Sequence, residues 1–91
     1  MPAGLGEFFA TIEEELGVDI WDPDEAAQTT PDELITHVLE TMPDIGGPMS
    51  DAERREYVET VLEELMEQVL GITQYDDSAT FAEILRSARR R

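Results

Sequence analysis

The chain of 91 residues contains no cysteine and no lysine. The absence of cysteine excludes disulfide bonds and thiolate metal sites, and it is compatible with a reducing compartment. No apolar run approaches the roughly 18 residues that cross a bilayer, and no basic segment followed by an apolar one opens the chain. We therefore expect a cytoplasmic protein without a membrane span or a secretory signal.

Positive charge is missing from the first half of the chain. Residues 1–49 contain no Lys or Arg, and the whole chain has a formal net charge of −16. The carboxylates of this half are Glu7, Glu13, Glu14, Glu15, Asp19, Asp22, Asp24, Glu25, Asp32, Glu33, Glu40 and Asp44. Such a surface repels nucleic acid and anionic membranes, and it attracts Arg- or Lys-rich protein surfaces and divalent cations. A salt-adapted or GC-rich genome would also produce an acidic chain without lysine, and the two explanations can coexist.

The length fits one small domain, because a chain of this size buries only enough apolar surface for a single core. With 41% hydrophobic residues, the chain is too apolar to be simply disordered. We expect residues 1–91 to form one helical domain. Its parts are a helix-loop-helix half (4–42), a linker rich in Pro and Gly (43–49), a long helix followed by a loop and a short helix (50–85), and an Arg-rich tail (86–91).

Apolar residues recur at helical spacing in several segments, and no segment alternates as a strand does. The first helix is expected over 5–16, with Gly17 as its C-cap. Capping boxes at Thr30 and Ser50 predict the starts of two further helices, one ending near Met42 and the other running unbroken to Gly71. The fold class is therefore all-α. We expect the aromatic core to consist of Phe8, Phe9, Trp21, Tyr57 and Phe81.

Two blocks of the sequence resemble parts of an acyl carrier protein, a four-helix bundle that carries substrates on a phosphopantetheine arm. Residues 8–40, with IEEELGVDI at 12–20 and TTPDEL at 29–34, are similar to the second, third and fourth carrier helices. Residues 59–85, with VLEEL at 61–65 and DDS at 76–78, resemble the first carrier helix and the loop after it. The resemblance implies a small four-helix bundle with a circularly permuted helix order.

The residue that defines the carrier family is missing from its matching position. Aligning residues 13–17 with the family places the attachment serine at about Pro2, which has no hydroxyl. Ser78, which follows Asp77, is the only local imitation of the attachment motif. An acyl or peptidyl carrier with its phosphopantetheine arm on Ser78 is therefore the alternative function, whereas the missing serine favours a protein without a cofactor.

Other candidate chemistry is weak. From Asp22 to Glu33 the acidic residues fit the first, third and twelfth positions of a calcium loop, but Ala26 and Ala27 occupy positions where that loop needs a ligand and a glycine. We expect no dedicated metal site. His37 is expected to be solvated on the polar side of its helix, without a catalytic partner. Arg55 is expected to pair with Glu59, four residues further along the same helix.

These observations predict a protein that binds other proteins and catalyses no reaction. The first helix and its following loop are expected to dock on a basic, Arg- or Lys-rich partner surface, and not on nucleic acid or a membrane. The expected partner-binding residues are Glu7, Glu13, Glu14, Glu15, Asp22, Asp24 and Glu25. A homodimer formed by exchange of halves across the Gly-containing linker is a further expectation.

Overall fold

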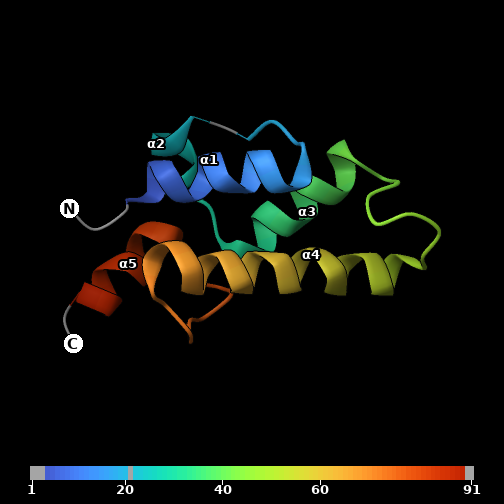
Figure 1. Cartoon of the computed structure of the whole chain (residues 1–91). Coiled ribbons are helices and arrows are strands. Elements are labelled where there is room, and N and C mark those ends of the chain that lie inside the picture. Colours follow the sequence, from blue (N-terminus) through green and yellow to red (C-terminus); the bar gives the residue numbers. More distant parts are fainter. Residues whose placement is uncertain (1–3, 21, 90–91) are drawn as a thin grey trace.

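The computed structural model describes residues 4–20 and 22–89, and over these residues it contains helices and no strand (Figure 1). Its elements are α1 (Leu5–Leu16), α2 (Pro23–Ala26), α3 (Pro31–Thr41), α4 (Asp51–Leu65), the π-helical segment η1 (Met66–Leu70) and α5 (Phe81–Arg89). The all-α class is confirmed. The described residues form five α-helices where four were expected, and the permuted carrier-like bundle stays a prediction.

Capping residues set the helix ends where the sequence places them. Gly17 ends α1 in the left-handed conformation, with φ of 68°. Thr30 and Ser50 each open a helix with a capping box: the hydroxyl accepts from the N–H three residues on, and the Glu there accepts from the cap's own N–H. Two predicted helix starts are thus confirmed.

A third capping box opens α5. The Glu83 N–H donates to the Thr80 hydroxyl at 3.2 Å, and the Thr80 N–H donates to the Glu83 carboxylate at 3.3 Å. Two further N–H groups of this helix end, those of Phe81 and Ala82, donate to carbonyl oxygens of the loop between α2 and α3. The start of α5 is therefore held by its own side chains and by a loop more than fifty residues earlier in the chain.

The long helix expected from Ser50 to Gly71 keeps its path but changes its hydrogen bonding. It is α-helical to Leu65 and π-helical from Met66 to Leu70, and Gly71 ends it with φ of 70°. The wider π turn accompanies a fully buried Met66, and η1 packs against α1. The expectation of one unbroken α-helix is corrected in this last turn.

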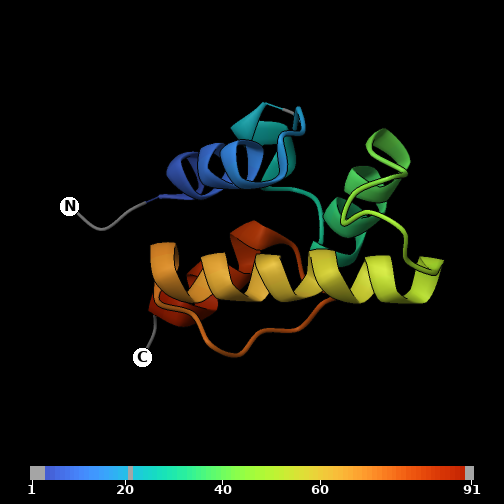
Figure 2. The same cartoon turned by 45° about the vertical axis from the view of Figure 1, so that its right-hand side comes forward.

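The elements form two layers around one core. In Figures 1 and 2, α1 to α3 lie on one side, and α4, η1 and α5 lie on the other. α1 packs against α2, α4 and η1, whereas α3 packs against α4. The buried side chains of both layers form a single hydrophobic cluster that includes Phe8, Phe9, Ile12, Leu34, Val38, Val58, Leu62, Met66, Phe81 and Ile84.

The expected aromatic core is confirmed for three of its members and corrected for one. Phe8, Phe9 and Phe81 are buried and in mutual contact, with ring centroids 5.2 to 5.7 Å apart. Tyr57 is 39% exposed, because α4 buries the face centred on Val58 and turns the neighbouring position outward. The expectation for Trp21 lies outside the described residues.

Candidate functional site

The carboxylates predicted to bind a partner lie on α1, on α2 and on the loop between them. Glu7, Glu14 and Glu15 of α1 and Asp24 and Glu25 of α2 are all exposed. Glu7 and Glu14 are seven residues apart, so they project from nearly the same side of α1. Because α1 packs against α2, the two sets belong to one layer, and we call them the α1–α2 surface.

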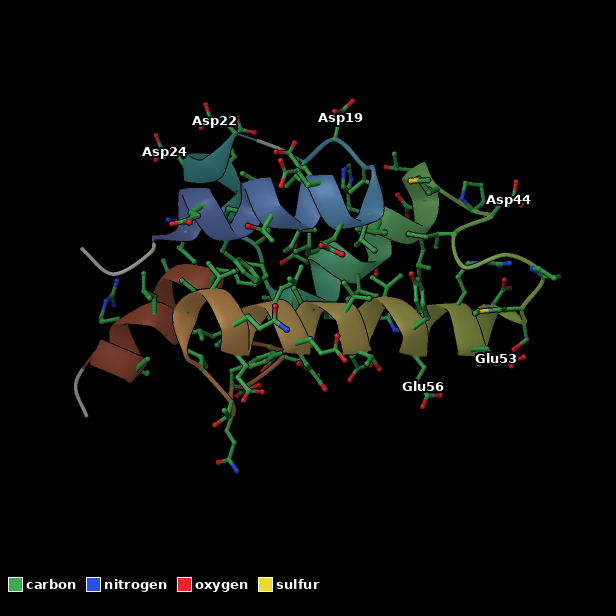
Figure 3. All side chains as sticks on the ribbon, in the orientation of Figure 1. Asp19, Asp22, Asp24, Asp44, Glu53 and Glu56 are labelled. Atoms are coloured by element: carbon green, nitrogen blue, oxygen red, sulfur yellow. The ribbon has the colours of Figure 1, made fainter. Side chains whose placement is uncertain are left out.

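The edge of this layer carries aspartates as well. Figure 3 shows Asp19, Asp22 and Asp24 along one edge of the molecule, pointing away from its body, with Glu53 and Glu56 on the opposite edge. Acidic side chains therefore occur on both edges. The two edges differ in positive charge, because residues 1–49, which include α1 and α2, contain no Lys or Arg.

Two of the seven predicted partner-binding residues also hold the backbone. Glu13 is half-buried, and its carboxylate accepts a hydrogen bond from the Ile20 N–H at 3.1 Å. Asp22 accepts from the Asp24 N–H with its side chain at 3.1 Å and from the Ala26 N–H with its carbonyl at 2.8 Å. Glu13 therefore closes the loop after α1, and Asp22 caps α2.

His37 also contacts this loop, through a hydrogen bond at an exposed site. The residue is partly exposed, and its Nε2 lies 3.0 Å from the Asp19 carbonyl oxygen. A carbonyl oxygen only accepts, so Nε2 donates in this bond. The loop between α1 and α2 is thus held from α1 by Glu13 and from α3 by His37.

The arginines at the start of α4 bond elsewhere. Arg55 forms its ion pair with Asp32 of α3 and donates to the Thr36 hydroxyl at 3.4 Å, so the close ion pair is formed across two helices and not with Glu59. The Arg55 charge still acts on Glu59, where it lowers the pKa against the larger effects that raise it. Arg54 donates to the linker and to Asp51. Neither guanidinium is bonded to a carboxylate of the α1–α2 surface.

Two groups with a raised pKa lie away from the α1–α2 surface, where the loop after η1 meets α4. Burial raises the pKa of Glu59, and the nearby Asp77 and Glu63 raise it further. Burial also raises the pKa of Tyr75, whose hydroxyl oxygen is buried without a hydrogen-bond partner. Sequence reasoning missed this region, because the loop and the helix are brought together only by the fold.

Ser78, the alternative attachment site, is exposed in the turn before α5. Its hydroxyl donates to the Asp76 carboxylate at 2.6 Å and its N–H donates to the same oxygen at 2.9 Å, which lowers the pKa of Asp76. The predicted turn is confirmed. Ser78 lies two residues before Thr80, the cap of α5, so it does not stand at a helix start as the attachment serine of a carrier does.

An open groove of about 570 Å³ runs between the loop after η1 and α5. Ile72, Tyr75, Ala79, Ile84 and Ala88 are among the residues that line it. None of the predicted partner-binding residues lies there. Among the described residues, no three His, Asp or Glu side chains are grouped so that they could hold a metal ion.

The described helices are too short or too polar to cross a membrane. Among known proteins, the chain matches no family model, no curated protein and no solved structure.

Proposed function

We propose that the protein is a non-catalytic adaptor whose α1–α2 surface docks electrostatically on an Arg- or Lys-rich surface of a partner protein. The observation that carries the proposal is the gathering of exposed carboxylates on α1 and α2 in a half of the chain without a single Lys or Arg. A surface of one charge sign speeds encounter with an oppositely charged partner, in a way that salt weakens. A cytoplasmic location, compatible with the cysteine-free sequence, is part of this proposal.

Hydrogen bonds to the described backbone around this surface support the proposal. Glu13 and His37 hold the loop between α1 and α2, and Asp22 caps α2. A surface that is ordered before binding loses less conformational entropy when the partner arrives. The exposed carboxylates of the α1–α2 surface are therefore carried by a backbone whose hydrogen bonds are formed before the partner binds.

A pair of matched variants tests the location of the docking surface. One variant carries Glu7→Gln and Glu14→Gln on α1, and the control carries Glu56→Gln and Glu67→Gln on α4 and η1. All four residues are exposed, so each variant removes two exposed charges. The probe is a labelled peptide of nine arginines, and stopped-flow fluorescence measures its association rate at low and high salt.

We expect the α1 variant to slow association at low salt by roughly three- to tenfold, and the control to slow it by less than about twofold. High salt should remove the difference, because the charges are then screened. Equal slowing by both variants would overturn the proposed location and favour an acidity that reflects salt adaptation. A photo-crosslinking residue at position 14, compared with one at position 56, then tests whether a basic protein is captured from the native cell through α1.

The competing function is a carrier with its arm on Ser78, which is favoured only by the exposure of that hydroxyl beside two aspartates. Co-expression with a phosphopantetheinyl transferase, followed by mass spectrometry of the intact protein, decides between the two. We expect the unmodified mass. A phosphopantetheine mass that is added to the original chain and absent from Ser78→Ala would overturn the adaptor function and support the carrier function.

The permuted relationship to carrier proteins is a separate proposal. The first turn of α1 and the last turn of α5 lie at the same end of the molecule in Figures 1 and 2, which is the arrangement that a circular permutation requires. A chain opened within 43–49, with residues 89 and 4 joined by a short Gly-Ser linker, should keep the helical content of the original by circular dichroism. An unfolded product would count against this relationship.

A further inference from the structure

The two halves of the chain share one core, so neither half has a core of its own. Phe8, Phe9 and Leu34 of the first half are buried against Leu62 and Phe81 of the second within a single hydrophobic cluster. Backbone hydrogen bonds from the start of α5 to the loop between α2 and α3 cross the same boundary. The surface between residues 4–42 and 50–89 is therefore the hydrophobic core itself.

The linker that joins the halves is held by one side chain. Arg54 donates from Nε to the Ile45 carbonyl at 3.0 Å, and from Nη2 to the Gly47 and Met49 carbonyls at 3.1 Å each. Its Nη1 reaches Asp51 at 3.4 Å, and the side chain is only 13% exposed. One guanidinium thus joins three linker carbonyls, and charge-assisted hydrogen bonds of this kind are stronger than neutral ones.

The linker is also turned tightly beneath this guanidinium. Gly46 and Gly47 both have φ of 84°, a left-handed conformation that glycine adopts without a steric penalty. A Cβ added to Gly46 would lie 3.1 Å from the Met49 side chain and 3.3 Å from the Tyr57 ring. Ile45, just before the glycines, is buried in the core. The turn therefore depends on glycine at positions 46 and 47, where a side chain would be strained.

We infer that residues 43–49 form a hinge that Arg54 holds closed, and that loss of the Arg54 contacts allows two copies of the chain to exchange their 4–42 halves. In an exchanged dimer each core is rebuilt from the halves of two chains, so the core contacts outside the linker are kept and the contacts that change are those of the linker, including the buried Ile45. The partner is accordingly a second copy of this chain, and the surface that it occupies is the core boundary described above. The choice between monomer and dimer then depends on the hinge.

The length and charge of the chain set the conditions for exchange. Seven extended residues span roughly 23 to 25 Å, which is enough to carry α4 away from its own α3. Two chains that each have a net charge of −16 repel one another, so exchange should need salt that screens this repulsion. We therefore expect exchange during refolding at high protein concentration in about 1 M NaCl, where the Debye length is about 3 Å.

The first experiment compares Arg54→Met with Arg55→Met under these refolding conditions. Both variants remove one charge from neighbouring positions of α4, but Arg55 bonds to α3 and not to the linker. Size-exclusion chromatography with light scattering measures the dimer fraction. We expect Arg54→Met to raise this fraction on the order of tenfold over the original chain, and Arg55→Met to leave it unchanged. A monomeric Arg54→Met, or equal dimerisation of the two variants, would overturn the inference.

A second variant tests the inference even if Arg54→Met does not fold. Deletion of Gly46 and Gly47, with Arg54 retained, makes the linker too short to turn back, and short hinges favour exchange. This variant should be a dimer with the helical content of the original chain by circular dichroism. If it is folded and monomeric, the hinge does not control exchange.

Crosslinking distinguishes exchange from other modes of association. Because the chain has no cysteine, Asp32→Cys and Arg55→Cys introduce two unique thiols at positions that contact one another across the two halves. A short bismaleimide should join them within one chain when the hinge is closed, and between two chains after exchange. Added to the Gly46–Gly47 deletion, the pair should give a covalent dimer on a denaturing gel. A dimer by light scattering that gives only monomer on the gel would exclude exchange.

Discussion

At the scale of single residues, the bonding of each carboxylate determines what it contributes. Glu13 and Glu14 are neighbours on α1, but Glu13 holds the Ile20 N–H whereas Glu14 is exposed to solvent. Glu53 is bonded to Ser50, and these bonds lower the pKa of Glu53. Glu59 differs from Glu53, because burial and neighbouring carboxylates raise its pKa. The charge total alone therefore does not say which acids stabilise the fold.

Replacing Glu59 by Gln should stabilise the protein at neutral pH. A carboxyl group whose pKa is higher in the folded state binds its proton more tightly there than in the unfolded state. Ionisation of the group therefore opposes folding as the pH rises from the unfolded-state pKa through the folded-state pKa. Below the ordinary Glu value of 4.5, the group is protonated in both states and the effect disappears. We expect Glu59→Gln to raise the melting temperature at pH 7 and to change it little at pH 3.5.

The matched control for this prediction is Glu64→Gln, which is exposed on the same helix and whose charge is not among those that raise the pKa of Glu59. It removes the same charge without the burial that raises the pKa of Glu59. Thermal unfolding followed by circular dichroism at both pH values gives the comparison. Equal shifts for the two variants at pH 7 would mean that net charge, and not the site of Glu59, accounts for the gain.

At the scale of elements, α5 depends on the aromatic contact with α1. The Phe9 and Phe81 rings meet edge to face, with centroids 5.2 Å apart, and both side chains are almost fully buried. We expect Phe81→Ala to lower the free energy of unfolding by about 3 to 5 kcal/mol, because it removes a buried ring and leaves a cavity. Urea unfolding measures the loss.

A double-mutant cycle with Phe9→Leu and Phe81→Leu isolates the ring contact from burial in general. An edge-to-face pair contributes about 0.5 to 1.5 kcal/mol beyond the area that it buries. The cycle should therefore give a coupling energy of that size, with both single variants still folded. Additive losses from the two substitutions would show that the rings fill space without a specific interaction.

The helices were predictable to the extent that their signals are local. The capping boxes at Thr30 and Ser50 and the αL glycine at position 17 act within one turn, so the sequence alone locates those helix ends. The same signal stands at Thr80 and Glu83, where it was missed. The change to π-helix at Met66 was not predictable, because a single π turn within a longer helix has no local residue signal comparable to a capping box.

The charged residues of the candidate site could be predicted from the sequence, whereas their hydrogen bonds and ion pairs could not. The sequence identifies the exposed acids of α1 and α2, but the partners of His37, Arg55 and Arg54 were missed. The Asp19 carbonyl lies 18 residues from His37, and Asp32 lies 23 residues from Arg55. Arg54 bonds to backbone carbonyls, which exist at every residue and leave no signature in a sequence. The bonding partners that the sequence pattern did not predict are therefore mostly brought together by tertiary folding.

At the scale of the whole molecule, the net charge of −16 acts on a body whose radius of gyration is 12.7 Å. The Debye length is about 10 Å at 0.1 M ionic strength and about 30 Å at 0.01 M, so at low salt the carboxylates repel one another over most of the molecule. This repulsion opposes the compact state. It is independent of which face carries the charge, whereas docking depends on the face.

Stability and docking should therefore respond differently to the same substitutions. In 10 mM salt, Glu7→Gln with Glu14→Gln and Glu56→Gln with Glu67→Gln should raise the melting temperature by similar amounts, because each pair relieves the same whole-molecule repulsion. Adding NaCl to about 1 M should raise the melting temperature of the original chain and remove the advantage of both pairs. MgCl₂ at equal ionic strength should give a comparable rise, since no group of acidic side chains in the described part of the chain is arranged to hold a metal ion. Scanning calorimetry across the salt series provides the measurement.

A gain in stability confined to the α1 pair would mean that repulsion is concentrated on the α1–α2 surface. The association rates would then need to be corrected for local unfolding before they could locate a docking face.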